Sequence, residues 1–326
     1  MTKIVSLGAG RMGRGIAHVF AYAGYEVGIV DFKERPAAAS ETLLSESKLE
    51  IRENLDFLLS LNVLREDEVA ATLARVTGFS IAGAADCIAQ ADYVFEGVPE
   101  TLEAKKDAIG RVSEIMKPDG VLASTTSTML STTLAEFSAR PSQFLNAHFL
   151  NPAYLIPLVE VSPSNQTEEV VTDRFVDLLD TIGKVPVRCN AAPGYIVPRL
   201  QSLVMSEACR MVEQGVATAE DIDKAVRSGF GLRFATMGPL EFVDWGGLDI
   251  LYYANRYLSS ELGERYRAPP IVDKLMAEGN LGLKTGKGMY DFSGKDLDAY
   301  RTEKFSTFVL LLKHLDLMPK SAQDKK

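Results

Sequence analysis

Short apolar runs alternate with longer amphipathic stretches over roughly the first 190 residues. The amphipathic stretches have the three-to-four-residue spacing of helices, whereas the apolar runs are short enough for buried strands. The runs lie at residues 4–7, 27–30, 93–95, 121–123, 144–148 and 158–161, and the helical spacing at residues 16–23, 37–61, 66–73, 102–116 and 167–182. This alternation predicts an α/β fold with a mostly parallel sheet covered on both faces. We expect a last strand at residues 185–187 to lie at an edge, since Pro186 cannot donate to a ladder.

The pattern changes from Pro193 onward, where helical spacing continues without intervening strands. We therefore predict a sheet domain over residues 1–190 and an all-α domain over residues 191–326. Apolar positions at helical spacing in residues 296–317 predict a C-terminal helix that packs on this helical domain or on a partner subunit. The last residues, 320–326, are expected to be disordered.

A glycine-rich turn directly follows the first predicted strand. Gly8, Gly10 and Gly13 form a GxGxxG pattern between that strand and a helix, which is the order a dinucleotide site requires. Asp31 ends the next strand, at the distance of ~20 residues where a carboxylate that binds the ribose of the dinucleotide is expected. A glycine turn without a ligand is the alternative. Asp31 favours NAD over NADP, although the neighbouring Lys33 and Arg35 weaken that preference.

Composition narrows the class of protein. The 326 residues are enough for two domains, and 46% hydrophobic with 24% charged residues is typical of a globular protein. A net charge of −9 argues against nucleic-acid or anionic membrane partners, which need basic surfaces, but not against small anionic molecules.

The cysteines and the N-terminus indicate a cytoplasmic protein. Cys87, Cys189 and Cys209 are odd in number and widely spaced, so the sequence predicts neither a disulfide framework nor a zinc site. A strand begins at once, leaving no room for a signal peptide, and no apolar run approaches the ~18 residues of a membrane span.

One of the three histidines stands where chemistry is expected. His148 lies at the carboxyl end of a predicted strand, the edge at which open α/β sheets bind ligands. Glu160 interrupts the next apolar run, and a buried carboxylate there needs a partner such as His148. The alternative is a surface carboxylate and an unrelated histidine. His18 and His314 are expected to be packing or surface residues.

Several motifs together resemble the 3-hydroxyacyl-CoA dehydrogenase family. The resemblance covers residues 3 to about 292 and is carried by Gly8-Ala-Gly-Arg-Met-Gly-Arg-Gly-Ile-Ala17, Val98-Pro-Glu100 with Lys105, Ser124-Thr-Thr-Ser127, His148-Phe-Leu-Asn-Pro152, Leu158-Val-Glu-Val161, Pro193-Gly-Tyr-Ile-Val197 and Lys284-Thr-Gly-Lys-Gly-Met-Tyr290.

This resemblance implies a Rossmann-type domain that binds NAD, with the glycine turn, Arg11, Met12 and Asp31 at the cofactor. It implies His148 as general base oriented by Glu160, and Ser127 and Asn151 in contact with substrate and nicotinamide. Cofactor contacts are further implied for Glu100, Lys105 and Lys284, as is a homodimer. The expected reaction is NAD-dependent oxidation of a β-hydroxyl, with 3-hydroxybutyryl-CoA converted to acetoacetyl-CoA.

Two departures from the family pattern bear on the substrate. Pro198 replaces a usual asparagine, and a proline inside the long helix should also kink it. Residues 50–62, which correspond to the family's basic CoA-binding helix, contain only Arg52 as a basic residue. A site for CoA phosphates is expected to be richer in Lys or Arg.

Residues 153–160 and 199–207 are similar to the λ-crystallin or L-gulonate 3-dehydrogenase branch. A free hydroxy acid, such as a gulonate-like or carnitine-like molecule, is therefore an alternative substrate. A non-catalytic, crystallin-like NAD-binding protein is a third possibility, because fold does not imply function.

Overall fold

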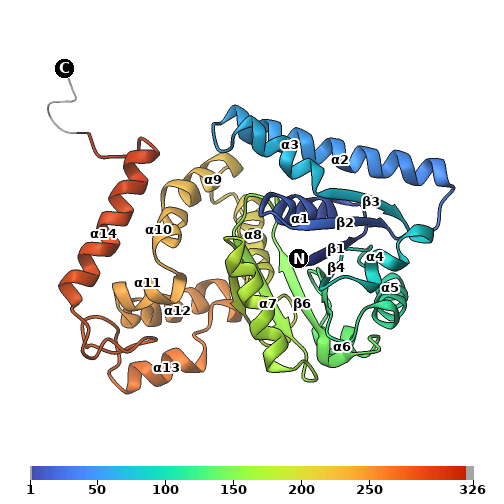
Figure 1. Ribbon diagram of the computed structural model, residues 1–326. Coiled ribbons are helices and arrows are strands. Elements are labelled where there is room, and N and C mark those ends of the chain that lie inside the picture. The colour runs from blue at the N-terminus through green and yellow to red at the C-terminus, as the bar shows by residue number, and fades with distance from the viewer. Residues whose placement is uncertain (1, 321–326) are drawn as a thin grey trace. The chain divides into compact units, whose positions relative to one another are not determined.

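The computed structural model (Figure 1) describes residues 2–320. The chain forms two compact units, and the division between them falls between Val204 and Met205. Helix α8 (Val197–Glu213) runs across that division.

The first unit is built on one eight-stranded sheet with the order β3-β2-β1-β4-β5-β6-β7-β8. Neighbouring strands are parallel except for β6 and β7, which are antiparallel. The strands are β1 (Lys3–Leu7), β2 (Glu26–Asp31), β3 (Val76–Ser80), β4 (Tyr93–Glu96), β5 (Val121–Ser124), β6 (Phe144–Phe149), β7 (Leu158–Pro163) and β8 (Val185–Arg188). The expected mostly parallel sheet is confirmed, and β8 with Pro186 is an edge strand as predicted.

Helices cover both faces of this sheet. One apolar core lies under α1 (Arg11–Tyr22), α2 (Ala37–Ser60), α3 (Glu66–Ala74) and α7 (Glu169–Thr181), and the other under α4 (Ala85–Ala89), α5 (Leu102–Ile115) and α6 (Ser131–Ala135). Strand residues alternate between the two cores, with Tyr93 and Phe95 in the first and Val94 in the second. Figure 1 shows α2 and α3 side by side on the α1 face.

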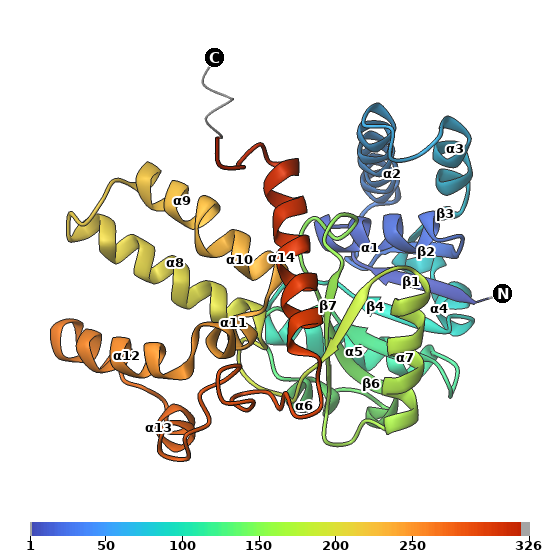
Figure 2. The same ribbon diagram turned by 90° about the vertical axis from the view of Figure 1, so that its left-hand side faces the viewer.

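The second unit, which begins at Met205 inside α8, is helical, as the predicted fold class requires. The domain boundary predicted after residue 190 stays a prediction. After α8, the helices of this unit are α9 (Ala219–Ser228), α10 (Phe230–Thr236), α11 (Pro239–Gly246), α12 (Leu248–Leu262), α13 (Pro270–Ala277) and α14 (Leu297–His314). Figure 2 shows α12 and α13 as neighbours. The sequence pattern did not predict α10 and α11, because they are short and their Gly and Pro flanks suggest loops.

The C-terminal helix α14 packs on its own unit. Glu241 on α11 accepts a hydrogen bond from Tyr300 at 2.6 Å and pairs with Lys304 at 2.8 Å, while Phe305 meets the ring of Trp245 edge-on. The expectation that this helix packs on the helical domain is therefore confirmed. The end predicted to be disordered lies, from residue 321 onward, outside the described residues.

The predicted proline kink is wrong. Helix α8 begins at Val197, so Pro198 stands in the first turn, where a backbone N–H has no intrahelical partner. Hydrogen bonding resumes directly after it, from Arg199 N to the Gly194 carbonyl at 3.0 Å and from Leu200 N to the Ile196 carbonyl at 3.1 Å. Pro198 therefore starts the helix without breaking its ladder.

Over residues 2–320, every helix is too short or too polar to cross a membrane. Within the same range, no cluster of three or more His, Cys, Asp or Glu side chains could hold a metal ion.

Candidate functional site

The glycine turn between β1 and α1 has the shape of a phosphate cradle. Gly8 has φ +97°, and a Cβ there would lie 2.7 Å from the Gly97 carbonyl oxygen. A Cβ on Gly13 would lie only 1.9 Å from the Gly8 carbonyl oxygen, so the close contact of helix and turn requires glycine. A Cβ on Gly10 would meet no atom within 4 Å. Open space at a helix N-terminus without a side-chain cap suits an anion such as a pyrophosphate.

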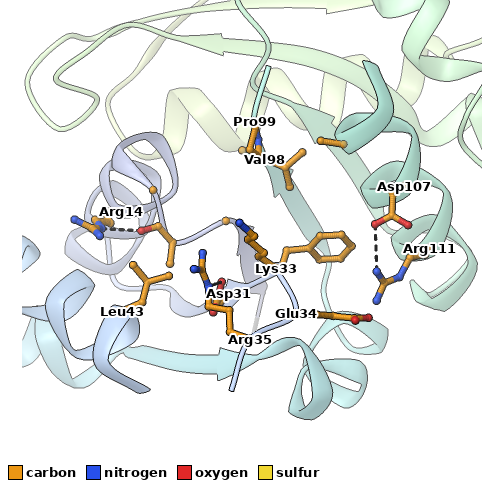
Figure 3. Close-up of a pocket in the computed structure, with 16 residues that line it drawn as sticks. Arg14, Asp31, Lys33, Glu34, Arg35, Leu43, Val98, Pro99, Asp107 and Arg111 are labelled. Carbon is orange, nitrogen blue, oxygen red and sulfur yellow. Dashed lines mark hydrogen bonds and ion pairs between the residues drawn. The ribbon is translucent and has the colours of Figure 1, made fainter. Parts of the chain in front are cut away.

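A pocket of about 880 Å³ opens beside this turn (Figure 3). It is lined by Gly8, Ala9, Gly10, Arg14, Asp31, Phe32, Lys33, Glu34, Arg35, Leu43, Gly97, Val98, Pro99, Ala104, Asp107 and Arg111. Asp31 is 2% exposed, and both its oxygens accept from Arg35 Nε, at 2.9 and 3.1 Å. The pocket thus combines a glycine cradle, apolar walls and a carboxylate at the end of β2, a combination that fits the adenosine half of a dinucleotide.

Arg11 and Met12 occupy the first turn of α1, beyond the glycine cradle. Arg11 is exposed, whereas Met12 is partly buried against the core. Neither side chain lines this pocket, so their expected cofactor contacts stay predictions.

A buried ion pair lies at the carboxyl ends of β4 and β5. Glu96 is 0% exposed, and its two oxygens each lie 3.1 Å from Lys105 Nζ. Glu96 also accepts hydrogen bonds from Val98 N at 2.8 Å and Ser124 Oγ at 2.5 Å. Sequence reasoning missed Glu96, although it ends an apolar strand with a charge, just as Glu160 interrupts one. Lys105 is 1% exposed and is therefore a buried bridge, not a surface cation.

Glu100 connects this pair to the loop that carries Ser127. One Glu100 oxygen lies 3.2 Å from Lys105 Nζ, and the other accepts from the Thr126 hydroxyl, from Ser127 N at 3.1 Å and from Thr128 Oγ1 at 3.0 Å. Burial raises the pKa of Glu100, but the Thr126 hydrogen bond and the charge of Lys105 outweigh it and hold this pKa below its usual range. An ionised Glu100 thus fixes the backbone at Ser127, whose side chain is exposed.

His148 and Glu160 face each other across the antiparallel pair β6 and β7. They are directly opposite in register, and His148 Nδ1 lies 2.7 Å from one Glu160 oxygen. The other oxygen accepts from Ile196 N and Val197 N, both at 2.8 Å, where α8 begins. Burial raises the pKa of Glu160, but these bonds from His148, Val197 and Ile196 outweigh it and lower the pKa overall.

The charge state of Glu160 sets the tautomer of His148. An ionised carboxylate only accepts hydrogen bonds, so Nδ1 of the neutral imidazole must carry the proton. The lone pair is then on Nε2, which makes this nitrogen a proton acceptor.

The remaining histidines have no carboxylate partner among the described residues. His18 is buried on α1 and stacked on Tyr154, with ring centroids 4.8 Å apart, and burial and Lys184 lower its pKa to about 4. His314 is exposed at the end of α14.

Two further predicted site residues stand apart from these networks. Asn151 is exposed in the turn between β6 and β7. Lys284 belongs to the second unit, where its ammonium pairs with Asp249. The turn that follows Lys284 is held by buried Asp244, which accepts from Met289 N at 2.9 Å and Tyr290 N at 2.8 Å.

Comparison with known proteins gives matches over nearly the whole chain. The family model described as 3-hydroxyacyl-CoA dehydrogenase, NAD binding domain, matches residues 3–192, and the model of the C-terminal domain of the same enzymes matches residues 194–292. A probable 3-hydroxybutyryl-CoA dehydrogenase of Deinococcus radiodurans is 35% identical over 292 residues, covering 89% of this chain and 100% of that protein.

Solved structures show the same relationship. A 3-hydroxyacyl-CoA dehydrogenase from Archaeoglobus fulgidus superposes with a TM-score of 0.75 at 30% identity, covering 98% of this chain and 100% of that one. An NAD⁺-dependent 5-formyl-3-hydroxy-2-methylpyridine 4-carboxylic acid 5-dehydrogenase gives a TM-score of 0.69 at 28% identity, covering 97% and 99%.

The glycine cradle, the pocket at the end of β2 and the buried histidine–glutamate pair thus occur in a chain that matches both domains of one enzyme family. The chain belongs to the 3-hydroxyacyl-CoA dehydrogenase family and is an NAD-dependent oxidoreductase.

Proposed function

We propose that this enzyme oxidises the 3-hydroxyl of a 3-hydroxyacyl thioester, with 3-hydroxybutyryl-CoA as substrate and acetoacetyl-CoA as product. The observation that carries the proposal is the buried pair of His148 and Glu160 at the end of β6. Relatives named 3-hydroxybutyryl-CoA dehydrogenase support the choice of substrate.

His148 is the proposed general base. Its Nε2 lone pair takes the hydroxyl proton, and the imidazolium that forms is stabilised by the Glu160 carboxylate 2.7 Å from Nδ1. Because Glu160 is held by two backbone donors as well, it does not need to reorganise as this charge develops.

The other proposed site residues hold the reactants. Asp31 binds the adenosine ribose, and the glycine turn with Arg11 and Met12 binds the pyrophosphate. Glu100, Lys105 and Lys284 support the nicotinamide half, and Ser127 and Asn151 orient the substrate oxygen beside it. NAD held by these residues would supply the acceptor for the hydride of the substrate carbon.

A free hydroxy acid is the second candidate substrate. Along α2, Arg52 pairs with Asp56 at 3.5 Å, and Lys48 donates to the Val76 carbonyl at 3.3 Å, so both cations already have partners. Few other cations are available there for the phosphates of CoA. The structurally similar pyridine carboxylic acid dehydrogenase is, by its name, an enzyme of a free carboxylic acid.

We also infer a cytoplasmic homodimer. Three large apolar side chains, Ile250, Tyr253 and Tyr257, are exposed at helical spacing on α12, and a second copy of the chain would cover them. The cytoplasmic location rests on the three unpaired cysteines.

Replacing the base tests the proposed mechanism. We expect His148→Gln to lower kcat by ~10² or more, because general-base catalysis contributes about that much, with NADH affinity unchanged. Steady-state kinetics and NADH fluorescence titration measure the two effects. His314→Gln, the same change on an exposed helix end, should keep wild-type kcat. An unaltered kcat in purified His148→Gln would rule out this base.

Charge-matched variants test the ribose site. We expect the wild type to prefer NAD over NADP by more than ~10-fold in kcat/KM, because a carboxylate at the end of β2 repels a 2′-phosphate. Asp31→Asn removes this charge and should narrow the preference. Glu34→Gln removes one charge from the exposed rim of the same pocket and should change the preference less. Equal changes in the two variants would contradict a specific role for Asp31.

The substrate is tested by following NADH formation with 3-hydroxybutyryl-CoA, free 3-hydroxybutyrate, gulonate and carnitine. Turnover of the thioester is expected. Lys48→Ala combined with Arg52→Ala should then raise its KM by ~10-fold or more, since charge-assisted bonds contribute ~1.5–3 kcal/mol each. Arg65→Ala, at an exposed arginine that directly precedes α3, is the control. Turnover of a free acid alone would replace the thioester in this proposal.

Light scattering after size-exclusion chromatography tests the homodimer. The wild type should have the mass of two chains, and Tyr257→Glu should shift it toward one, because a charge would be buried in the contact. Tyr22→Glu changes an exposed tyrosine in the first unit and should leave the mass unaltered. A monomeric wild type would refute the dimer.

A further inference from the structure

Tyr195 covers one face of the proposed base. It lies between β8 and α8, is 6% exposed, and stacks on the imidazole of His148 with ring centroids 5.3 Å apart and planes 15° from parallel. The ring of His148 is thus held from two directions, by Glu160 at its edge and by Tyr195 on its face.

The hydroxyl of Tyr195 is bonded to the loop that carries Ser127. It donates toward the carbonyl oxygens of Thr126 at 3.1 Å and Met129 at 3.3 Å, and it accepts from Asn146 Nδ2 at 2.8 Å. Asn146 is 0% exposed and donates to the Met129 carbonyl at 2.9 Å. These partners flank Ser127, so the hydroxyl fixes the loop relative to the His148 ring.

The backbone of Tyr195 is in a conformation that a bulky residue rarely adopts. Its φ is +45°, directly after Gly194 at +74°. The next two amides, of Ile196 and Val197, both donate to Glu160 at 2.8 Å. A tyrosine whose backbone lies in the left-handed region is strained, and the surrounding contacts must stabilise this conformation.

We propose that Tyr195 is a positioning residue that aligns the base, its carboxylate partner and the Ser127 loop as one unit. This inference rests on the proposed function of His148. The ring limits rotation of the imidazole away from Glu160, the hydroxyl holds the Ser127 loop, and the following amides hold Glu160. Because the hydroxyl is fully engaged by protein partners, its loss should affect turnover more than binding.

Tyr195→Phe tests the proposal, since it removes the hydroxyl and keeps the ring. One hydrogen bond of this kind is equivalent to about 3- to 10-fold in rate, so kcat should fall by about that factor. The KM values for NAD and substrate should stay within about twofold. Tyr195→Leu, which also removes the stacked ring, should lower kcat further. Tyr93→Phe, at a buried tyrosine that begins β4, is the matched control and should keep wild-type kcat.

The double variant separates positioning from a general loss of structure. If Tyr195 acts through His148, Tyr195→Phe should change kcat less than about twofold when His148 is already Gln. An unaltered kcat in Tyr195→Phe, or an equal loss in both backgrounds, would overturn the inference while leaving His148 as the base. A fully active His148→Gln would instead overturn the proposed function, and the inference with it.

Discussion

The site depends on keeping one fully buried carboxylate ionised. Glu160 is 0% exposed, and a buried charge costs several kcal/mol unless donors replace the water it has lost. Three N–H groups do so here, from the imidazole of His148 and from two successive backbone amides at the start of α8. The partial positive charge of that helix end favours the anion further. Because those amides belong to another element, the anion couples β6, β7 and α8.

The change of strand direction in the sheet makes this arrangement possible. β6 and β7 are the one antiparallel pair of the sheet, so His148 near the end of β6 stands directly opposite Glu160 near the start of β7. A second buried carboxylate, Glu96, plays a similar role at the ends of β4 and β5, where it accepts hydrogen bonds from other elements. From there the bonds continue through Lys105 and Glu100 to Ser127. Two buried anions thus organise the carboxyl edge of the sheet.

Much of this fold could be predicted from the sequence. Buried parallel strands are continuous apolar runs, and the helices between them have apolar residues at every third or fourth position. β3 (Val76–Ser80) was missed because it is an edge strand with exposed residues and a glycine at its centre. The predicted kink at Pro198 was wrong because the start of a helix depends on local backbone geometry, which the spacing of apolar residues does not reveal. The apposition of His148 and Glu160 could be expected from strand ends and an out-of-place charge.

The contacts between distant segments could not be predicted. Tyr195 meets His148 across 47 positions of sequence, and nothing in its immediate motif reveals the stacked ring or the hydrogen bonds to the Ser127 loop. The pairing of Asp31 with Arg35 depends on how the chain turns after β2. Such contacts follow from tertiary packing, which local patterns do not determine.

Whether Glu160 holds His148 in one tautomer can be measured by ¹⁵N NMR of histidine-labelled protein. The chain has only three histidines, so the His148 signals can be assigned by their loss in His148→Gln. For neutral His148, the contact with Glu160 predicts a proton on Nδ1 and a free lone pair on Nε2. A neutral His148 with its proton on Nε2 would contradict the role of His148 as base, because that nitrogen could not then accept the substrate proton.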